Sequence, residues 1–282
     1  MSERAGGVAV VTGAANGLGF GLAGALGARG MRLVVADIDD GALAHTQAEL
    51  ARDGVEVLAV RTDVTKRDDV TALADATLER FGGVDVVCLN AGVSLRGRAW
   101  ELTVDDWRWI YDVNVFGVIH GIRSFVPALV EQGRGHVVIT ASNTAVTVQP
   151  TLAPYVSSKH AVLSIAEVLQ HDLRNAGTQI NVSIALPSAI RSDMADAVRH
   201  RPTDYGQVEV AEDLLRASRA FLAEHGADPR SMAEGILRRA LDERTFCIFT
   251  DPADASTVIP RAEALRDGQL PDVVAPVVLE NR

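Results

Sequence analysis

The fold of this 282-residue chain is decided by the stretch Val8-Ala-Val-Val-Thr12-Gly13-Ala-Ala-Asn16-Gly17-Leu18-Gly19. Its first five residues are apolar or β-branched, which predicts a buried strand. The glycines predict a tight turn, and a pattern of helical period follows them. A helix start presents unpaired N–H groups, and glycines, which lack a Cβ atom, let an anion come close. The stretch therefore predicts a pyrophosphate site; a plain turn between strand and helix is the alternative.

Short β-rich runs alternate with longer segments of helical period through the rest of the chain. Such alternation predicts a Rossmann-type doubly wound α/β fold, with a parallel sheet of about seven strands and helices on both faces. The strands are predicted at residues 8–12, 32–36, 55–61, 84–89, 136–141, 179–185 and 246–249. Helices are predicted between them, for example at residues 18–29, 41–52 and 70–81.

The chain shows no sign of a second domain. No repeat, low-complexity tract or Pro/Ser-rich linker interrupts it, so residues 1–282 are predicted to form a single dinucleotide-binding catalytic domain. One long irregular stretch, at about 188–230, contains a polar break and then a helical run near 208–222. We expect this stretch to form a lid over a substrate.

The bulk composition excludes several classes of protein. A net charge of −10 argues against nucleic acid as a partner. We expect no membrane span, because no apolar run approaches the roughly 18 residues that one needs. The first seven residues do not resemble a signal peptide, so a cytoplasmic protein is expected, with Cys88 and Cys247 as free thiols. The seven histidines lack metal-ligand spacing, and no metal site is predicted.

An acidic residue, Asp37, ends the second predicted strand 24 residues after Gly13. A carboxylate at this place can accept hydrogen bonds from the adenosine ribose and would repel a 2′-phosphate. Two unit charges about 4 Å apart interact by roughly 4 kcal/mol at an effective dielectric near 20. Neither Asn16 nor Ile38 supplies a compensating cation, so the sequence predicts NAD rather than NADP. A solvated aspartate at a strand end is the alternative.

Three polar residues downstream carry the chemistry. Tyr155 stands four residues before Lys159, so the two share a helix face, and Ser142 stands thirteen residues before Tyr155. With two lysines and three tyrosines in the chain, chance would give this Tyr-Lys spacing only about 0.02 times. A neighbouring ammonium favours phenolate and lowers the tyrosine pKa. The spacing therefore predicts that Tyr155 is a general base.

With the loop and the trio in place, the chain resembles the short-chain dehydrogenase/reductase family, in its single-domain NAD(P)-dependent branch. The resemblance covers about residues 6–195 and 230–250. The matching motifs are Thr12 to Gly19 for T-G-x-x-x-G-x-G, Asp63-Val64, Asn90-Ala91-Gly92, the helix asparagine Asn114, and Ser142, Tyr155 and Lys159. The cofactor contacts that the resemblance implies are Gly13, Asn16, Gly17, Leu18, Gly19, Asp37, Ile38, Asp63, Val64, Asn90, Ala91, Gly92, Tyr155, Lys159, Pro187, Ile190 and Ser192.

Each member of the catalytic set has an expected role. Tyr155 takes the alcohol proton as hydride leaves for the nicotinamide, and Ser142 holds the substrate oxygen by a hydrogen bond. Lys159 lowers the pKa of Tyr155 and bonds the nicotinamide ribose. The resemblance also implies that Asn114 holds a water that links the lysine to solvent. The alternative for Asn114 is a helix polar group that faces water.

The chain departs from the family pattern after the sixth strand, where Pro187-Ser188 replaces Pro-Gly. Ser188 must tolerate the backbone angles of that glycine or tilt the loop. Its hydroxyl can face the substrate or form a turn, and both readings stay open. A second departure is Leu89-Asn90 in place of Asn-Asn, and Ser192 keeps a hydroxyl for the nicotinamide carboxamide where threonine is frequent.

The substrate is predicted to be a bulky, largely apolar secondary alcohol of aryl, terpenoid or steroid-like type. This rests on the expected lid and on apolar residues after the catalytic serine: Val146, Val148, Pro150 and Leu152. Arg96 and Arg98, in the loop after Gly92, leave an acidic substrate open.

Three functions fit the motifs to different degrees. The leading one is an NAD-dependent alcohol dehydrogenase or ketone reductase. An epimerase or dehydratase of the extended branch lacks its usual T-G-x-x-G-x-x-G loop here, and a non-enzymatic NAD sensor has no need of the complete trio. The helices near 115–130 and 156–173 are apolar over more than one stripe. The resemblance implies a homotetramer or homodimer built through these helices.

Overall fold

The computed structural model describes residues 6–206, 208 and 212–273, and within them a seven-stranded parallel sheet forms the centre. The strands follow the order β3-β2-β1-β4-β5-β6-β7. The prediction of a doubly wound parallel sheet is confirmed, and each strand begins and ends within two residues of its predicted bounds. The strands are β1 (Val8–Thr12), β2 (Arg32–Asp37), β3 (Val57–Arg61), β4 (Val86–Leu89), β5 (Arg134–Thr140), β6 (Gln179–Leu186) and β7 (Cys247–Phe249).

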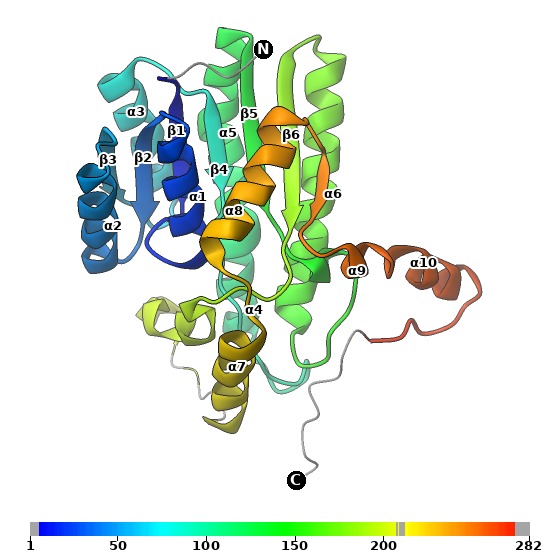
Figure 1. The fold of residues 1–282 in the computed structure, drawn as a ribbon. Helices are drawn as coiled ribbons and strands as arrows, with labels where there is room; N and C mark the ends of the chain where they lie inside the picture. Colours follow the sequence, from blue (N-terminus) through cyan, green and yellow to red (C-terminus); the bar gives the residue numbers. More distant parts are fainter. Residues whose placement is uncertain (1–5, 207, 209–211, 274–282) are drawn as a thin grey trace.

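Helices cover both faces of the sheet (Figure 1). Alternate side chains of β1 enter two separate cores, because Val10 packs on one side while Ala9 and Val11 pack on the other. Burial on both faces explains why the strands are almost continuously apolar. One face carries α1 (Gly17–Ala28), α2 (Asp40–Arg52) and α8 (Pro229–Leu237). The other carries α3 (Arg67–Phe81), α5 (Gly117–Gln132) and α6 (Ala153–Asn175).

The strand order reverses between β1 and β4, which are direct neighbours. At such a switch point the connections leave on opposite faces and open a crevice at the carboxyl ends of the strands. The glycine loop follows β1 and the Asn-Ala-Gly motif follows β4, so both border this crevice.

The predicted lid lies beneath the carboxyl ends of the strands and is fastened to α4 (Val104–Tyr111) (Figure 1). Arg201 forms an ion pair with Asp106, and both side chains are buried. The Tyr205 hydroxyl donates a hydrogen bond of 2.8 Å to Asp112. Two helical segments of the lid are a 3-10 helix (Asp193–His200) and α7 (Glu212–His225). Of the helical run predicted at 208–222, residues 209–211 lie outside the described residues.

One helical stretch bears on the expectation that the chain has no membrane span, which stays a prediction. Helix α4, a π-helical turn (Asp112–Phe116) and α5 run continuously over 29 residues, and an 18-residue segment within them has a mean hydropathy of 1.5. By length and composition this stretch is long and apolar enough to cross a membrane. Its side chains Phe125 and Leu129 are nevertheless fully buried against the sheet, as in the core helix of an α/β domain.

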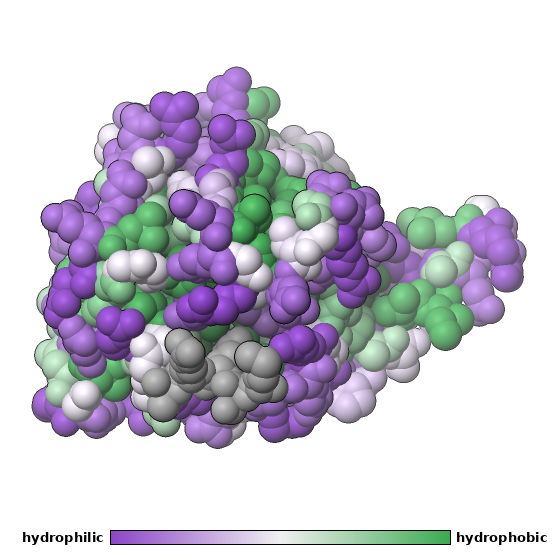
Figure 2. Space-filling view, turned by 90° about the horizontal axis from the view of Figure 1, so that it is seen from above, coloured by the Kyte–Doolittle hydropathy of each residue, from purple (hydrophilic) through white to green (hydrophobic). Residues whose placement is uncertain are grey.

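The C-terminal part of the described chain forms an arm that projects sideways from the body (Figure 1). It contains α9 (Pro252–Ala255) and α10 (Val258–Arg266). Apolar side chains gather on this arm (Figure 2), and Ile259 and Leu265 are 69% and 52% exposed. The arm therefore presents an apolar surface outside the main core.

Candidate active site

A pocket of about 440 Å³ occupies the crevice at the carboxyl ends of the strands. Its wall contains the glycine loop, Asp37, Asp63, the Asn-Ala-Gly motif, the predicted catalytic trio and residues from both helical segments of the lid. Each cofactor-binding and substrate-binding residue predicted from the sequence lines it. Among the predicted catalytic residues, Asn114 lies behind the wall rather than in it.

The glycine loop offers bare backbone to the pocket. A Cβ atom at Gly13 would lie 2.8 Å from the Cα atom of Ala91, and one at Gly19 would lie 1.9 Å from the carbonyl oxygen of Gly13. The Asp37 carboxylate accepts hydrogen bonds of 3.0 Å from the Ala15 N–H and 3.1 Å from the Asp39 N–H. The loop thus sits at the start of α1 with a carboxylate beside it, an arrangement that fits the pyrophosphate and ribose of a nicotinamide dinucleotide.

Asn90 ties the carboxyl ends of three strands together. Its side-chain amide donates to the carbonyl oxygens of Thr12 and Gly13, at 3.0 and 3.2 Å. Its side-chain oxygen accepts a hydrogen bond of 3.1 Å from the Thr140 hydroxyl. Both amide protons are used within the protein, so this side chain holds the glycine loop in place from the floor of the pocket.

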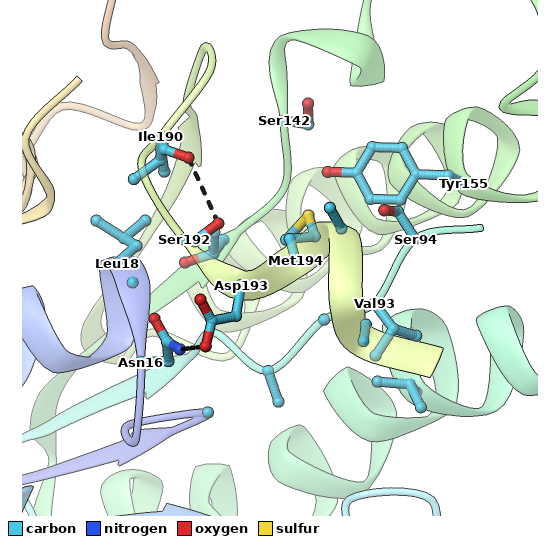
Figure 3. A pocket seen from close by; sticks show the side chains of 18 of the residues that line it. Asn16, Leu18, Val93, Ser94, Ser142, Tyr155, Ile190, Ser192, Asp193 and Met194 are labelled. Atoms are coloured by element: carbon cyan, nitrogen blue, oxygen red, sulfur yellow. Dashed lines mark hydrogen bonds between the residues drawn. The ribbon is translucent and has the colours of Figure 1, made fainter. Parts of the chain in front are cut away.

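The catalytic trio meets at one side of the pocket. Figure 3 shows the Tyr155 hydroxyl directed toward the space below Ser142, with Ser94 and Met194 nearby. The Lys159 Nζ atom lies 5.6 Å from the centre of the Tyr155 ring and donates to the Thr140 carbonyl oxygen at 3.2 Å. The predicted spacing therefore brings the three side chains together.

The expected lowering of the Tyr155 pKa is absent from this structure. Burial raises the pKa of Tyr155, and its hydrogen bond with Ser142 opposes this only in part. Burial also lowers the pKa of Lys159 to about 8. Both side chains are more than nine-tenths buried, and removal from water disfavours phenolate and ammonium alike. The protein alone therefore holds the phenol neutral at pH 7.

Asn114 is a positioning residue within the fold. It lies on the π-helical turn, a feature frequent at functional sites, and is completely buried. Its amide donates to the Val93 carbonyl oxygen and to the Ser158 hydroxyl, each at 3.0 Å, and its oxygen accepts from the Val93 N–H at 2.9 Å. Because the side chain does not face water, that alternative is wrong. The predicted water site near Lys159 stays a prediction.

A hydrogen-bonded chain that the sequence did not reveal extends from the catalytic serine. The Ser142 hydroxyl donates to the Asn143 side-chain oxygen at 3.1 Å. The Asn143 amide in turn donates to Asp254 at 3.0 Å, and this carboxylate is buried. Asp254 thereby fixes which end of the Asn143 amide faces Ser142. No local motif signals this contact, since 111 residues separate Asn143 from Asp254.

The same carboxylate accepts a hydrogen bond from Ser188. The Ser188 hydroxyl donates to Asp254 at 2.5 Å, and its N–H donates to the Thr250 hydroxyl at 3.0 Å. The Ser188 hydroxyl thus gives its one proton to Asp254, and because Ser188 lines the pocket its contact with substrate stays a prediction. Ser188 has no positive φ angle, so it replaces glycine without backbone strain.

The lid is bonded directly to the glycine loop. The Asn16 side-chain amide donates to Asp193 at 2.6 Å (Figure 3), and Asp193 also pairs with Arg199 at 3.1 Å. A Cβ atom at Gly17 would lie 2.8 Å from the Cβ atom of Ser192. Asn16, predicted to contact the cofactor, thus also connects the cofactor side of the pocket to the substrate side.

A glycine loop at the switch point of a parallel sheet, with a Ser-Tyr-Lys set in the same pocket, defines a dinucleotide-dependent oxidoreductase of the Rossmann type. The chain belongs to the short-chain dehydrogenase family, which it matches over residues 7–203.

Two curated relatives and two solved structures illustrate the likeness. The 1-deoxy-11-beta-hydroxypentalenate dehydrogenase of Streptomyces avermitilis is 37% identical over 88% of this chain and 86% of its own. The C alpha-dehydrogenase of a Sphingobium strain is 35% identical over 86% and 79%. A Burkholderia phymatum short-chain dehydrogenase/reductase in complex with NAD has a TM-score of 0.93 and 39% identity, covering 99% of this chain and 100% of that one. A Thermococcus sibiricus alcohol dehydrogenase with 5-hydroxy-NADP has a TM-score of 0.71 and 26% identity, covering 86% and 95%.

The pH dependence of unfolding should reveal the buried Lys159. Its pKa is about 8 in the folded protein, below its usual value of 10.5, so the unfolded state binds more protons between these two pH values. The free energy of unfolding therefore rises with pH in this window. We expect Lys159→Met to have a higher free energy of unfolding than the wild type at pH 7. The difference between the two proteins should narrow toward pH 10.

Urea unfolding of the cofactor-free protein at several pH values measures this gap. The matched control is Lys66→Met, because the Lys66 side chain is 65% exposed and pairs with Asp63 at 3.7 Å. A Lys159→Met gap that does not change with pH would contradict the buried ammonium.

Proposed function

We propose that the protein is an NAD-dependent oxidoreductase that interconverts a bulky, largely apolar secondary alcohol and its ketone by hydride transfer. The observation that carries this proposal is one continuous pocket that joins the glycine loop and Asp37 to Ser142, Tyr155 and Lys159. Membership of the short-chain dehydrogenase family supports the same class of reaction.

The protein's own groups would handle the proton and the orientation of the substrate. NAD supplies the hydride acceptor or donor when it is bound. Tyr155 takes the hydroxyl proton in oxidation and returns it in reduction. The Ser142 oxygen is held by the Thr144 N–H at 3.2 Å, and its proton can turn from Asn143 toward the substrate oxygen. A positively charged nicotinamide beside Tyr155 would favour phenolate and offset the effect of burial.

The choice of NAD over NADP rests on Asp37. Its carboxylate lies in the pocket at the end of β2, where a 2′-phosphate would meet a like charge. The Burkholderia phymatum relative in complex with NAD supports this choice, while the Thermococcus sibiricus relative shows that the fold also accepts an NADP-type cofactor.

The substrate side of the pocket supports a bulky apolar alcohol. Its wall combines the loop before Tyr155 with both helical parts of the lid, and its apolar members include Val148, Leu152, Met194, Leu215, Phe221 and Leu222. The two curated relatives are named for a hydroxypentalenate and for a C alpha position. These names support a terpenoid or aryl alcohol as the substrate class, with a steroid-like alcohol as a further candidate of similar shape.

We also propose that the protein acts in the cytoplasm as a homotetramer or homodimer. Apolar side chains stay exposed on α5 and α6, among them Val130 and Val168 at 44% and 58%. The C-terminal arm adds Ile259 and Leu265. Exposed apolar surface on these elements fits burial against a second copy of the chain.

Replacement of the proposed base tests the reaction. We expect Tyr155→Phe to lower turnover of secondary alcohols by about 100-fold or more, because the proton acceptor is lost. The affinity for NADH, measured by fluorescence titration, should stay unchanged and serves as the control for folding. Turnover near the wild-type rate, followed at 340 nm, would show that another group takes the proton.

Replacement of Asp37 tests the cofactor preference. We expect Asp37→Asn and Asp37→Ala to narrow the NAD/NADP ratio of kcat/KM by about tenfold, because both remove the like charge. The asparagine keeps an acceptor for the Ala15 N–H, so it separates the effect of charge from damage to the loop. An unchanged ratio in both variants would remove Asp37 from the selection of cofactor.

Light scattering of the purified protein tests the assembly. We expect the wild type to be a dimer or tetramer, and Val168→Asp or Ile259→Asp to shift the equilibrium toward monomer, because each places a charge in an apolar interface. Leu78→Asp on α3 is the control, since Leu78 is exposed but lies on neither proposed surface. A monomeric wild type at micromolar concentration would contradict the proposal.

A further inference from the structure

Arg96 lies in the wall of the pocket without a counter-ion. In the part of the chain that the structure describes, its side chain makes one hydrogen bond, of 3.3 Å from Nη1 to the Thr151 hydroxyl, and no ion pair. A guanidinium has five N–H donors in a planar fork. Most of its capacity for hydrogen bonds is therefore left for a ligand.

The other cations that line the pocket are already matched. Arg199 pairs with Asp193 at 3.1 Å and also donates from Nε to the Nε2 atom of His200 at 2.8 Å. Lys159 donates to the Thr140 carbonyl oxygen beside Tyr155. Within the described residues, Arg96 is thus the pocket cation with neither an anionic partner nor a place in the proposed chemistry.

Burial makes the lack of a counter-ion at Arg96 destabilising. Arg96 is half-buried, and loss of water lowers its pKa from the usual value. Its neighbour Leu95 is buried in an apolar cluster with Trp109. A partly desolvated cation without an anion is destabilising, and an anionic ligand would relieve that cost.

The position of Arg96 places it on the substrate side. The Gly97 N–H donates to the Thr151 carbonyl oxygen at 2.9 Å, so two contacts join the Arg96 loop to the loop that precedes Tyr155. Thr151 has a φ angle of 67°, a left-handed conformation that is unfavourable for a β-branched residue. By contrast, Asp37 is the last residue of β2, and the glycine loop follows β1.

We propose that Arg96 binds the carboxylate of the substrate, which would make the substrate a bulky, apolar hydroxy acid and the product the matching keto acid. The inference rests on the proposed function, and it narrows the substrate class. A carboxylate accepts two parallel hydrogen bonds from a guanidinium, which fixes orientation as well as position. The apolar body of such an acid would lie along the lid while its alcohol carbon reaches Tyr155.

Matched pairs of acid and ester test this inference in the intact enzyme. The probes are para-(α-hydroxyethyl)benzoate and its longer biphenyl homologue, each compared with its own methyl ester, assayed with NAD at saturation. We expect kcat/KM for at least one acid to exceed that of its ester by about tenfold, and Arg96→Met to abolish this preference through a higher KM for the acid. Arg96→Lys should keep part of the preference for the acid, because the lysine ammonium retains the positive charge but lacks the planar pair of N–H donors.

The control is Arg98→Met in the same loop. Arg98 pairs with Glu101 at 3.0 Å and lies over the Trp100 ring, outside the pocket, so both acid and ester turnover should stay as in the wild type. If the acids show no advantage, or if Arg96→Met slows acid and ester equally, Arg96 has a structural role and the inference is overturned while the alcohol dehydrogenase stands. If neither acids, esters nor neutral secondary alcohols are turned over with NAD or NADP, the proposed function itself fails.

Discussion

The close approach of backbone to backbone at Gly19 is the constraint on which the site depends. A side chain there would collide with the carbonyl oxygen of Gly13, so the first turn of α1 can press against the end of β1 only because Cβ is missing. The packing directs the N–H groups of the helix start into the crevice. Asn90 then holds the Gly13 carbonyl from β4, and Asp37 holds the Ala15 N–H from β2. One contact between glycines thus fixes three strand ends around the cofactor side of the pocket.

Burial determines the pKa values of Tyr155 and Lys159, as close packing determines the shape of the glycine loop. Tyr155 and Lys159 share a helix face, yet the protein removes both from water. This burial raises the pKa of Tyr155 and lowers the pKa of Lys159, so the neutral form of each is favoured. A site that is held neutral responds strongly to an added positive charge, because few water dipoles are left to screen it. In the proposed reaction, an oxidised nicotinamide beside Tyr155 would therefore favour its ionisation, which would link the proton transfer to the hydride transfer.

Local patterns were sufficient to predict most of the sheet and the residues that line the pocket. Strands such as β1 are short apolar runs, and Tyr155 and Lys159 are brought together by helix geometry alone. Contacts between distant segments were not predictable, because no spacing rule connects Ser188 or Asn143 to Asp254. The pKa of Tyr155 was misjudged for a related reason, since the depth of burial depends on tertiary packing and not on neighbours four residues away. The length of the continuous helix that includes α5 was also not predicted, because Asn114, His120 and Arg123 interrupt its apolar residues in the sequence.

The cofactor side of the pocket depends mainly on local sequence patterns, whereas the substrate side depends on contacts between segments that are distant in the sequence. Most of the predicted cofactor contacts lie at or just after the carboxyl ends of strands, so the sheet sets their positions. The substrate wall instead combines three segments, the Arg96 loop, the loop before Tyr155 and the lid, which lie far apart in the sequence and meet through contacts such as those of Arg96 and Gly97 with Thr151. A single substitution there can exchange a charge for an apolar surface without disturbing a strand end. Substrate preference can therefore change while hydride transfer is kept, and the charge that matters for recognition is the one left without a partner inside the protein.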